Sequence, residues 1–321
     1  MDLKLMLRKV VAVNILVLFV GLIGLIGGAL IVGRLIPADE QILYMANFNA
    51  QYDLFLSDLR TLHTLQITRG QSQNSRYPAW SPDGRYIAYH GHIEQRHGVF
   101  IMDMQTWDVH WLDFGLDDLG DRYDEAMVNW SPDGQRIAFH RGNDQVGYAI
   151  YIADATGANP IRLTSGDGHN IHAYWSPDGE KIAYTRYVLE DGRLSNVGVI
   201  HVLDVVDAIN GIDTVGERLG RGIFPAWSPD GGTVIYADDE SGTYQIFVFD
   251  LTTGVSRQLT APDNYQQNTM PDWSPDGEWI VFSSSQAVNY AIYKMRHDGT
   301  DITRLSVPIT RFDLQAPAWR P

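Results

Sequence analysis

Several side chains that could bind a ligand stand at a fixed distance before a repeated tryptophan. Five residues before it, the copies carry Ser75, Glu125, Asn170, Gly222, Asn268 and Leu314. Carboxylate, amide and hydroxyl oxygens are the ligands that Ca²⁺ prefers. Glu125, Asn170 and Asn268 are therefore candidate metal ligands, provided that the fold brings them to one axis. The alternative is that they are ordinary polar loop residues.

A second set of side chains stands three residues before the same tryptophan. Its members are mostly apolar or aromatic: Tyr77, Met127, His172, Phe224, Met270 and Ala316. With Arg76 and Arg221 nearby, they would form an apolar and aromatic funnel suited to a peptide or a small ligand. The candidate binding residues are Arg76, Tyr77, Glu125, Asn170, His172, Arg221, Phe224, Asn268 and Met270.

Histidines form a third group. His90, His92 and His97 lie close together in the sequence, and His140 occupies the same repeat position as His90. Two imidazoles from neighbouring repeats could share a zinc or copper ion. Since the chain has no cysteine to add a thiolate, a hydrogen-bonded surface pair is the simpler interpretation.

The elements that must position these side chains are repeats. Trp-Ser-Pro-Asp-Gly begins at Trp80, Trp130, Trp175, Trp227 and Trp273, and a degraded copy begins at Trp319. The spacings are 50, 45, 52, 46 and 46 residues. A period near 45 in units built from strands is typical of a β-propeller.

Each repeat is expected to form four strands. Ser-Pro-Asp-Gly has the chemistry of a hairpin turn, because proline presets φ, aspartate binds backbone amides and glycine adopts positive φ. The flanking β-branched and aromatic runs are too short for helices. The motif tryptophans and aspartates are therefore expected to have structural roles, in the core and in the turns.

The two ends of the repeat region complement each other. Residues 42–44, 54–58 and 65–68 provide three strands of a unit without its tryptophan strand, and residues 316–319 provide that strand alone. Joining them gives an all-β, six-bladed propeller of four-stranded blades with a composite closing blade. A non-closing solenoid would need capping repeats, which the sequence does not contain.

The repeated motif and its Ile-Ala-Tyr or Ile-Ala-Phe followers resemble the TolB-type propeller repeat over residues 41–321. The resemblance implies that the tryptophan strand is innermost, so the residues before it would gather at one channel mouth. TolB itself has an α/β domain before its propeller and binds a lipoprotein. A hydrophobic segment stands in that place here, so the resemblance does not imply a Tol–Pal role.

That hydrophobic segment, residues 10–32, carries no charged residue. As a helix it would extend over about 34 Å, enough to cross a bilayer. Lys4, Arg8 and Lys9 precede it, which favours a cytoplasmic N-terminus. We expect a cytoplasmic tail at 1–9, a transmembrane signal anchor at 10–36 and a propeller at 37–321. A cleaved signal peptide is the alternative, but its apolar region would be shorter.

Composition narrows the classes of function. The formal net charge of −15 disfavours nucleic-acid binding, which needs a basic surface. The absence of cysteine excludes disulfides, thiolate metal sites and cysteine nucleophiles. Gly-x-Ser-x-Gly, His-Glu-x-x-His and phosphate-loop motifs are also absent, so hydrolase and nucleotide-binding signatures are missing.

The predicted function is a single-pass, membrane-tethered propeller in the periplasm or at the cell exterior. It would be a non-enzymatic scaffold that binds a protein or peptide at its channel mouth, with no cofactor. Two alternatives remain: a channel-centred Ca²⁺ site with a structural, hydrolase or lyase role, and carbohydrate binding in the cell envelope. Trp107, Trp111 and Tyr123 could stack on sugars in the second case.

Overall fold

The computed structural model describes residues 41–48, 51–61, 63–68, 73–94, 96–115, 124–144, 146–165, 168–190, 193–261, 266–285, 289–305 and 313–321. The chain divides into two units, Met1–Ala38 and Asp39–Pro321, and every described element belongs to the second. The predicted tail at 1–9 and anchor at 10–36 lie outside the described residues. Within the described ranges, no helix has the length and apolar character that a membrane crossing requires.

The described part of the second unit is all-β apart from a short helix, α2 (Val205–Ile209). Four strands form each of four separate sheets. The first sheet contains β26 (Leu314–Trp319), β1 (Gln41–Phe48), β2 (Gln51–Asp58) and β3 (Thr64–Gln66), in that order. The second contains β4 (Gln73–Trp80), β5 (Tyr86–Ile93), β6 (Arg96–Asp103) and β7 (Val109–Trp111). The other two contain β18 (Ile223–Trp227), β19 (Thr233–Asp238), β20 (Gln245–Asp250) and β21 (Val255–Gln258), and β22 (Asn268–Trp273), β23 (Trp279–Ser284), β24 (Ala291–Arg296) and β25 (Thr303–Arg304).

Two further repeats are joined into one eight-stranded sheet. One repeat provides β8 (Asp124–Trp130), β9 (Arg136–Asn143), β10 (Gly147–Asp154) and β11 (Ile161–Arg162), and the other provides β12 (His169–Trp175), β13 (Lys181–Tyr187), β16 (Val199–Asp204) and β17 (Glu217–Arg221). A single parallel bridge between Tyr148 and His169 connects them. The insertion after β13 contains a small hairpin of β14 (Leu189–Glu190) and β15 (Arg193–Leu194).

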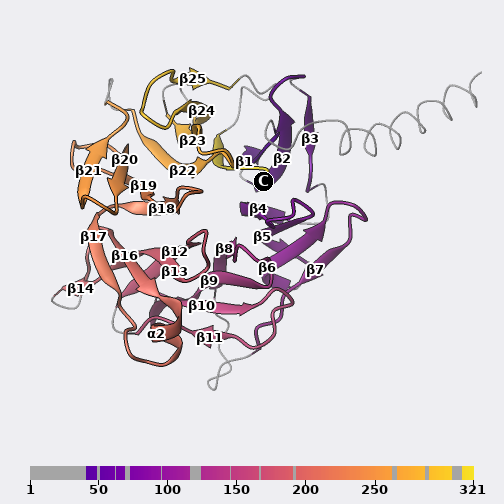
Figure 1. Cartoon of the computed structure of the whole chain (residues 1–321). Helices are drawn as coiled ribbons and strands as arrows, with labels where there is room; N and C mark the ends of the chain where they lie inside the picture. The colour runs from indigo at the N-terminus through magenta and orange to yellow at the C-terminus, as the bar shows by residue number, and fades with distance from the viewer. Residues whose placement is uncertain are drawn as a thin grey trace, which may run out of the picture. The chain divides into compact units, whose positions relative to one another are not determined.

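The first strands of successive repeats touch one another around a common centre. β4 contacts β8, β8 contacts β12, β12 contacts β18, β18 contacts β22, and β22 contacts β26, which also contacts β4. Figure 1 shows these strands at the centre, with β3, β7, β21 and β25 further out. The tryptophan strand is thus the inner strand of each repeat.

The first sheet combines strands that are far apart in the sequence. β1 pairs antiparallel with β2 on one side and with β26 on the other, with Ile42 opposite Trp319. The Arg320 guanidinium donates from Nη1 to Gln41 Oε1 at 2.8 Å and from Nη2 to the Gly84 carbonyl at 3.1 Å. Arg320 therefore links the first sheet to the turn after β4.

The motif tryptophans lie between neighbouring sheets. All six are buried: Trp80, Trp130, Trp175, Trp227, Trp273 and Trp319. Trp273 of β22, for example, packs with Ile235 and Ile246 of the preceding sheet. Burial of side chains of this size is the main stabilising contribution of the motif.

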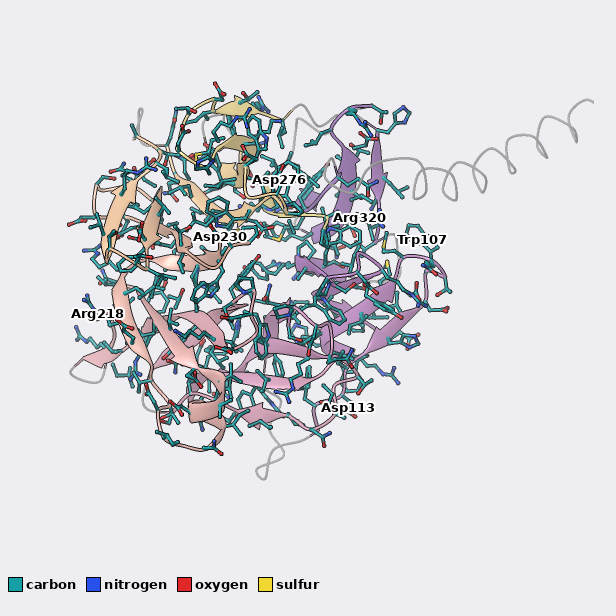
Figure 2. The ribbon with its side chains drawn as sticks, viewed as in Figure 1. Trp107, Asp113, Arg218, Asp230, Asp276 and Arg320 are labelled. Atoms are coloured by element: carbon teal, nitrogen blue, oxygen red, sulfur yellow. The ribbon has the colours of Figure 1, made fainter. Side chains whose placement is uncertain are left out.

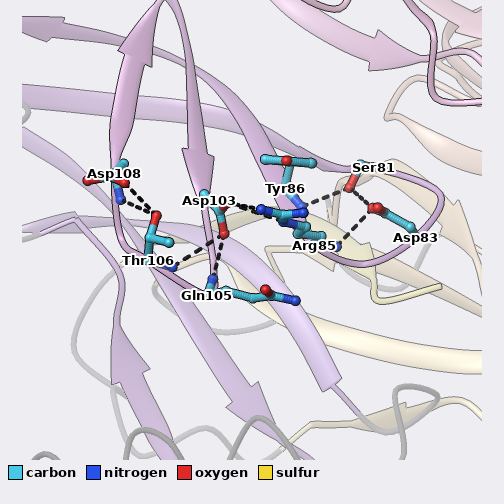
Figure 3. Close-up of polar contacts among 8 residues, drawn as sticks. All are labelled: Ser81, Asp83, Arg85, Tyr86, Asp103, Gln105, Thr106 and Asp108. Atoms are coloured by element: carbon cyan, nitrogen blue, oxygen red, sulfur yellow. Dashed lines mark hydrogen bonds and ion pairs between the residues drawn. The ribbon is translucent and has the colours of Figure 1, made fainter.

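The Ser-Pro-Asp-Gly segment forms the expected turn, as Figure 3 shows for its first copy. Ser81 Oγ donates to Asp83 Oδ1 at 2.6 Å, and Asp83 Oδ1 accepts the backbone N–H of Arg85 at 3.0 Å. The backbone N–H of Tyr86 donates back to Ser81 Oγ at 2.8 Å. The four other copies repeat these bonds. The repeated carboxylates therefore hold turns.

A second aspartate ends the third strand of the repeat. Asp103 Oδ1 accepts the backbone N–H groups of Gln105 at 2.7 Å and Thr106 at 3.3 Å (Figure 3). Its other oxygen accepts from the Arg85 guanidinium at 2.8 Å. This hydrogen bond lowers the pKa of the Asp103 carboxyl, so the carboxylate stays ionised and the turn stays capped at neutral pH.

We expect Asp178→Ala to lower the free energy of unfolding at pH 7 by about 1 kcal/mol, the net contribution of such hydrogen bonds. Asp178 Oδ1 accepts from Ser176 Oγ at 2.5 Å and from the Glu180 N–H at 3.0 Å. The Ser176 hydroxyl lowers the pKa of this carboxyl, so the effect should vanish as the pH falls through that pKa. Urea unfolding provides the measurement. The exposed neighbour Glu180→Ala is the control, and an equal effect of both variants would contradict the prediction.

Candidate functional site

The inner strands line an open cavity of about 400 Å³. Its lining comes from β4, β8, β12, β18, β22 and β26, and includes the motif tryptophans and the prolines two residues after them. In Figure 2, the turn residues Asp230 and Asp276 lie toward the centre around which the sheets are arranged. Trp107, Asp113 and Arg218 lie at the outer edge of the arrangement. The four-stranded sheets and the eight-stranded sheet therefore all contribute to one central cavity.

A β-bulge in the inner strands directs one side chain of each repeat into this cavity. The register of β8 against β9 shifts between Ala126 and Asn129, and Met127 inside the shift has a φ of 52°. The equivalent residue has positive φ in every repeat: Tyr77, Met127, His172, Phe224, Met270 and Ala316. All six line the cavity. Left-handed backbone at non-glycine residues costs about 1 kcal/mol or more for each residue, so the fold maintains this orientation against a local preference.

The predicted residues at this bulge position lie together in the cavity. They are Tyr77, His172, Phe224 and Met270. The rings of His172 and Phe224 stack with centroids 4.1 Å apart, and His172 Nδ1 lies 3.1 Å from Thr185 Oγ1. Burial lowers the pKa of His172 well below its usual value. The imidazole is therefore neutral at pH 7 and acts as part of an aromatic wall.

The predicted residues five positions before the tryptophan are not among the described residues that line the cavity. Asn170 and Asn268 are buried. Asn170 Nδ2 donates to the Tyr148 carbonyl at 3.1 Å, and Asn268 Nδ2 donates to Gln245 Oε1 at 2.8 Å. The side chain of Glu125 lies outside the described residues, so the calcium site remains a prediction.

The two predicted arginines make contacts outside the cavity lining. Arg76 donates from Nε to Asn74 Oδ1 at 2.9 Å, and its guanidinium lies 4.5 Å from the centroid of the Tyr52 ring. Arg221 forms an ion pair with Asp239 at 2.6 Å. Both cations are thus engaged by neighbouring side chains.

The histidines of this group lie against other aromatic rings. The rings of His90 and His97 meet edge to face at 4.7 Å, and His140 meets Tyr148 in the same way at 5.4 Å. Within the described ranges, no group of three or more histidine, aspartate or glutamate side chains could hold a metal ion. Of the proposed sugar-stacking residues, Trp107 is 39% exposed, while Trp111 lies under the Arg96 guanidinium.

With the inner-strand geometry established, comparison with known proteins gives the family. The model of the TolB beta propeller domain matches residues 140–321. The chain belongs to this family. No curated protein sequence shows significant similarity to it.

Solved structures agree with a TolB-type propeller fold. TolB from Acinetobacter baumannii superposes with a TM-score of 0.71 at 22% identity, covering 89% of this chain and 68% of that one. A protein described as TolB from Agrobacterium tumefaciens gives 0.61 at 20% identity, covering 88% and 99%. Hydrazine synthase from Kuenenia stuttgartiensis gives 0.67 at 13% identity, covering 87% and 46%. At these identities the similarity shows the fold alone.

The TolB-like propeller of this chain has polar cavity residues that the sequence analysis missed. They stand immediately before the motif tryptophan, where the copies carry Ala79, Asn129, Tyr174, Ala226, Asp272 and Ala318. Tyr174 of β12 donates its hydroxyl to Asp272 Oδ1 of β22 at 2.8 Å. The backbone N–H of Trp319 donates to Asp272 Oδ2 at 3.2 Å. The sequence did contain a signal for these residues, because this repeat position varies between alanine, asparagine, tyrosine and aspartate.

Asp272 has an unusual environment. Burial raises the pKa of its carboxyl to about 6, although the hydrogen bond from Tyr174 opposes this shift. Burial also raises the pKa of Tyr174 well above its usual value, so the phenol keeps its proton. At neutral pH the cavity therefore contains an ionised carboxylate among neutral aromatic and apolar groups.

Proposed function

We propose that this chain is a non-enzymatic, membrane-tethered scaffold whose central cavity holds a segment of a protein or peptide partner. The observation that carries the proposal is the cavity itself, to which every inner strand contributes a side chain through the same bulge. Its volume of about 400 Å³ falls in the range typical of ligand pockets. Membership in the TolB beta propeller domain family supports a binding scaffold.

The proposal includes a six-bladed ring. The chain of contacts from β4 through β8, β12, β18, β22 and β26 back to β4 supports a closed arrangement, as does the pairing of β26 with β1. In this arrangement β26, β1, β2 and β3 form the composite closing blade. The eight-stranded sheet then corresponds to two blades connected by one bridge.

The location is part of the same proposal. The uncharged segment at residues 10–32 and the basic residues before it support a single-pass anchor with a cytoplasmic N-terminus. The propeller would then face the periplasm or the cell exterior. A binding module at that surface needs no cofactor.

Site-specific photo-crosslinking tests this function in cells of the source organism that produce the full chain. A photoreactive phenylalanine analogue replaces Tyr77 or Phe224 inside the cavity, or Val255, which is 59% exposed on β21. We expect both cavity positions to capture the same peptide segment of one partner and Val255 to capture none of it. If the cavity positions give only intramolecular products, or the same set as Val255, the cavity is not the binding site.

A further inference from the structure

The cavity carries a negative charge that its folding role does not require. Asp272 Oδ2 accepts the backbone N–H of Trp319, the tryptophan of the next repeat. Asn129 does the same with a neutral amide, because its Oδ1 accepts the N–H of Trp175 at 3.0 Å. Three other repeats have alanine at this position: Ala79, Ala226 and Ala318. Neither the hydrogen bond to the next tryptophan N–H nor the formation of the inner strand therefore requires a carboxylate at this position.

This charge has no cationic partner within the protein as described. None of the ion pairs among the described residues involves Asp272. The described residues that line the cavity include Asp272 but no lysine or arginine. A desolvated carboxylate without a counter-charge is unfavourable, so its presence at a replaceable position points to a ligand that supplies the positive charge.

The walls around Asp272 suit an organic cation. Tyr77 and Phe224 present aromatic rings to the cavity, and ring faces attract ammonium and guanidinium groups. His172 is neutral at pH 7 because burial lowers its pKa, so it does not repel a cation. Met127 and Met270 add polarizable, adaptable surface. An anionic ligand would meet the carboxylate of Asp272, and the described lining has no lysine or arginine to offset it.

We infer that the cavity recognises a basic side chain, a lysine ammonium or an arginine guanidinium, projecting from the bound segment onto the carboxylate of Asp272 between aromatic walls. This inference rests on the proposed function, because it names the chemical group through which the cavity selects its partner. The Tyr174 hydroxyl, which already donates to Asp272 Oδ1, fixes the carboxylate so that its remaining lone pairs accept from the cation.

Methyl NMR of the full chain, labelled at its methionines, tests the inference. The signals of Met127 and Met270 are assigned with single leucine variants. The probes are acetylated and amidated glycine pentapeptides with a central lysine, arginine, norleucine or glutamate, added at millimolar concentration. We expect the lysine or arginine peptide to shift both signals and to bind about tenfold more tightly than the norleucine peptide.

Two variants give the decisive comparison. Asp272→Asn keeps an oxygen for the Trp319 N–H, as Asn129 does elsewhere, and should bind the basic and norleucine peptides equally. Glu217→Gln, which removes one negative charge from an exposed position on β17, should keep the preference. Circular dichroism verifies that both variants fold. The inference is overturned if the wild type does not prefer a basic peptide, or if Asp272→Asn retains the preference.

The crosslinking experiment separates the two levels of proposal. If Tyr77 and Phe224 capture a segment that has no basic residue at the crosslinked site, the cavity binds a partner but the charge inference is wrong. If neither position captures a segment, the proposed function itself fails.

Discussion

Acidification from pH 7 to pH 4 should destabilise the wild-type chain by about 3 kcal/mol more than it destabilises a His140→Thr variant. His140 on β9 is 8% exposed. Burial, with smaller effects of His90 and His169, lowers the pKa of its imidazole to about 3. The folded chain therefore keeps His140 neutral across this range, while the unfolded chain protonates it below a pH of about 6.5.

Acidification lowers the free energy of unfolding because the pKa of His140 is lower in the folded chain than in the unfolded chain. Because the folded-state pKa is depressed, the stability that neutral His140 permits is complete above the unfolded pKa and is lost as the pH falls toward the folded pKa. Burial likewise lowers the pKa of His90 to about 4, so His90 acts in the same direction. Asp272 acts in the opposite direction, since its pKa is raised to about 6, but it is common to both proteins and cancels in the comparison.

Threonine is a suitable replacement because other repeats have small neutral residues at this position. They are Thr185, Ala237 and Ser283, all of them buried. Urea unfolding at pH 7 and at pH 4, followed by tryptophan fluorescence, gives the two free energies. His110→Thr, at an exposed position on β7, should leave the acid sensitivity unchanged. A His140→Thr variant as acid-sensitive as the wild type would refute the explanation.

Gly222→Ala is expected to lower the free energy of unfolding by at least about 3 kcal/mol, through backbone strain and overpacking together. Gly222 precedes β18 and has a φ of 144°. A Cβ there would lie 2.3 Å from Cδ2 of Tyr236 and 3.2 Å from the Ala237 carbonyl oxygen. The Tyr236 ring is held by stacking on Phe247 and by a hydrogen bond between its hydroxyl and the Ser256 hydroxyl, so it cannot move aside easily.

Gly254→Ala separates the two contributions. Gly254 also has positive φ, at 69°, but no described atom apart from its immediate neighbours lies within 4 Å of the added Cβ. Its replacement should cost only the backbone preference, about 1 kcal/mol. Equal losses for the two variants in urea unfolding would mean that the contact with Tyr236 does not matter.

The repeats and their turns were predictable because their chemistry is local. Ser81 and Asp83 bond to groups within five residues of themselves, so five copies of the motif predict five copies of the turn. The strands expected at residues 42–44 and 54–58 lie within β1 and β2. The structural roles assigned to the motif tryptophans and aspartates agree with their burial and hydrogen bonds.

The cavity lining was predictable only in part, because the bulge interrupts the strand period. In a regular strand, residues three and five positions before the tryptophan share one face. The register shift between Ile171 and Tyr174 breaks that alternation, so His172 lines the cavity while Asn170 is buried outside its lining. A bulge of this kind depends on pairing with the next strand, which residue spacing does not reveal.

The Tyr174–Asp272 contact lies beyond sequence reasoning for a different reason. The two residues are 98 positions apart, and variation at their repeat position does not show that they meet. They meet because β12 and β22 both line the central cavity. The charged site exists because the arrangement of the sheets brings together residues that occupy the same repeat position.

The position of β1 has a mechanical consequence. Any tension transmitted through the residues before Gln41 enters the domain at a strand that is hydrogen-bonded along both edges, to β2 and to β26. A pull along β1 must shear two ladders at once, whereas a terminal strand at an outer edge could be peeled away bond by bond. A force applied at Gln41 therefore acts on both ladders together.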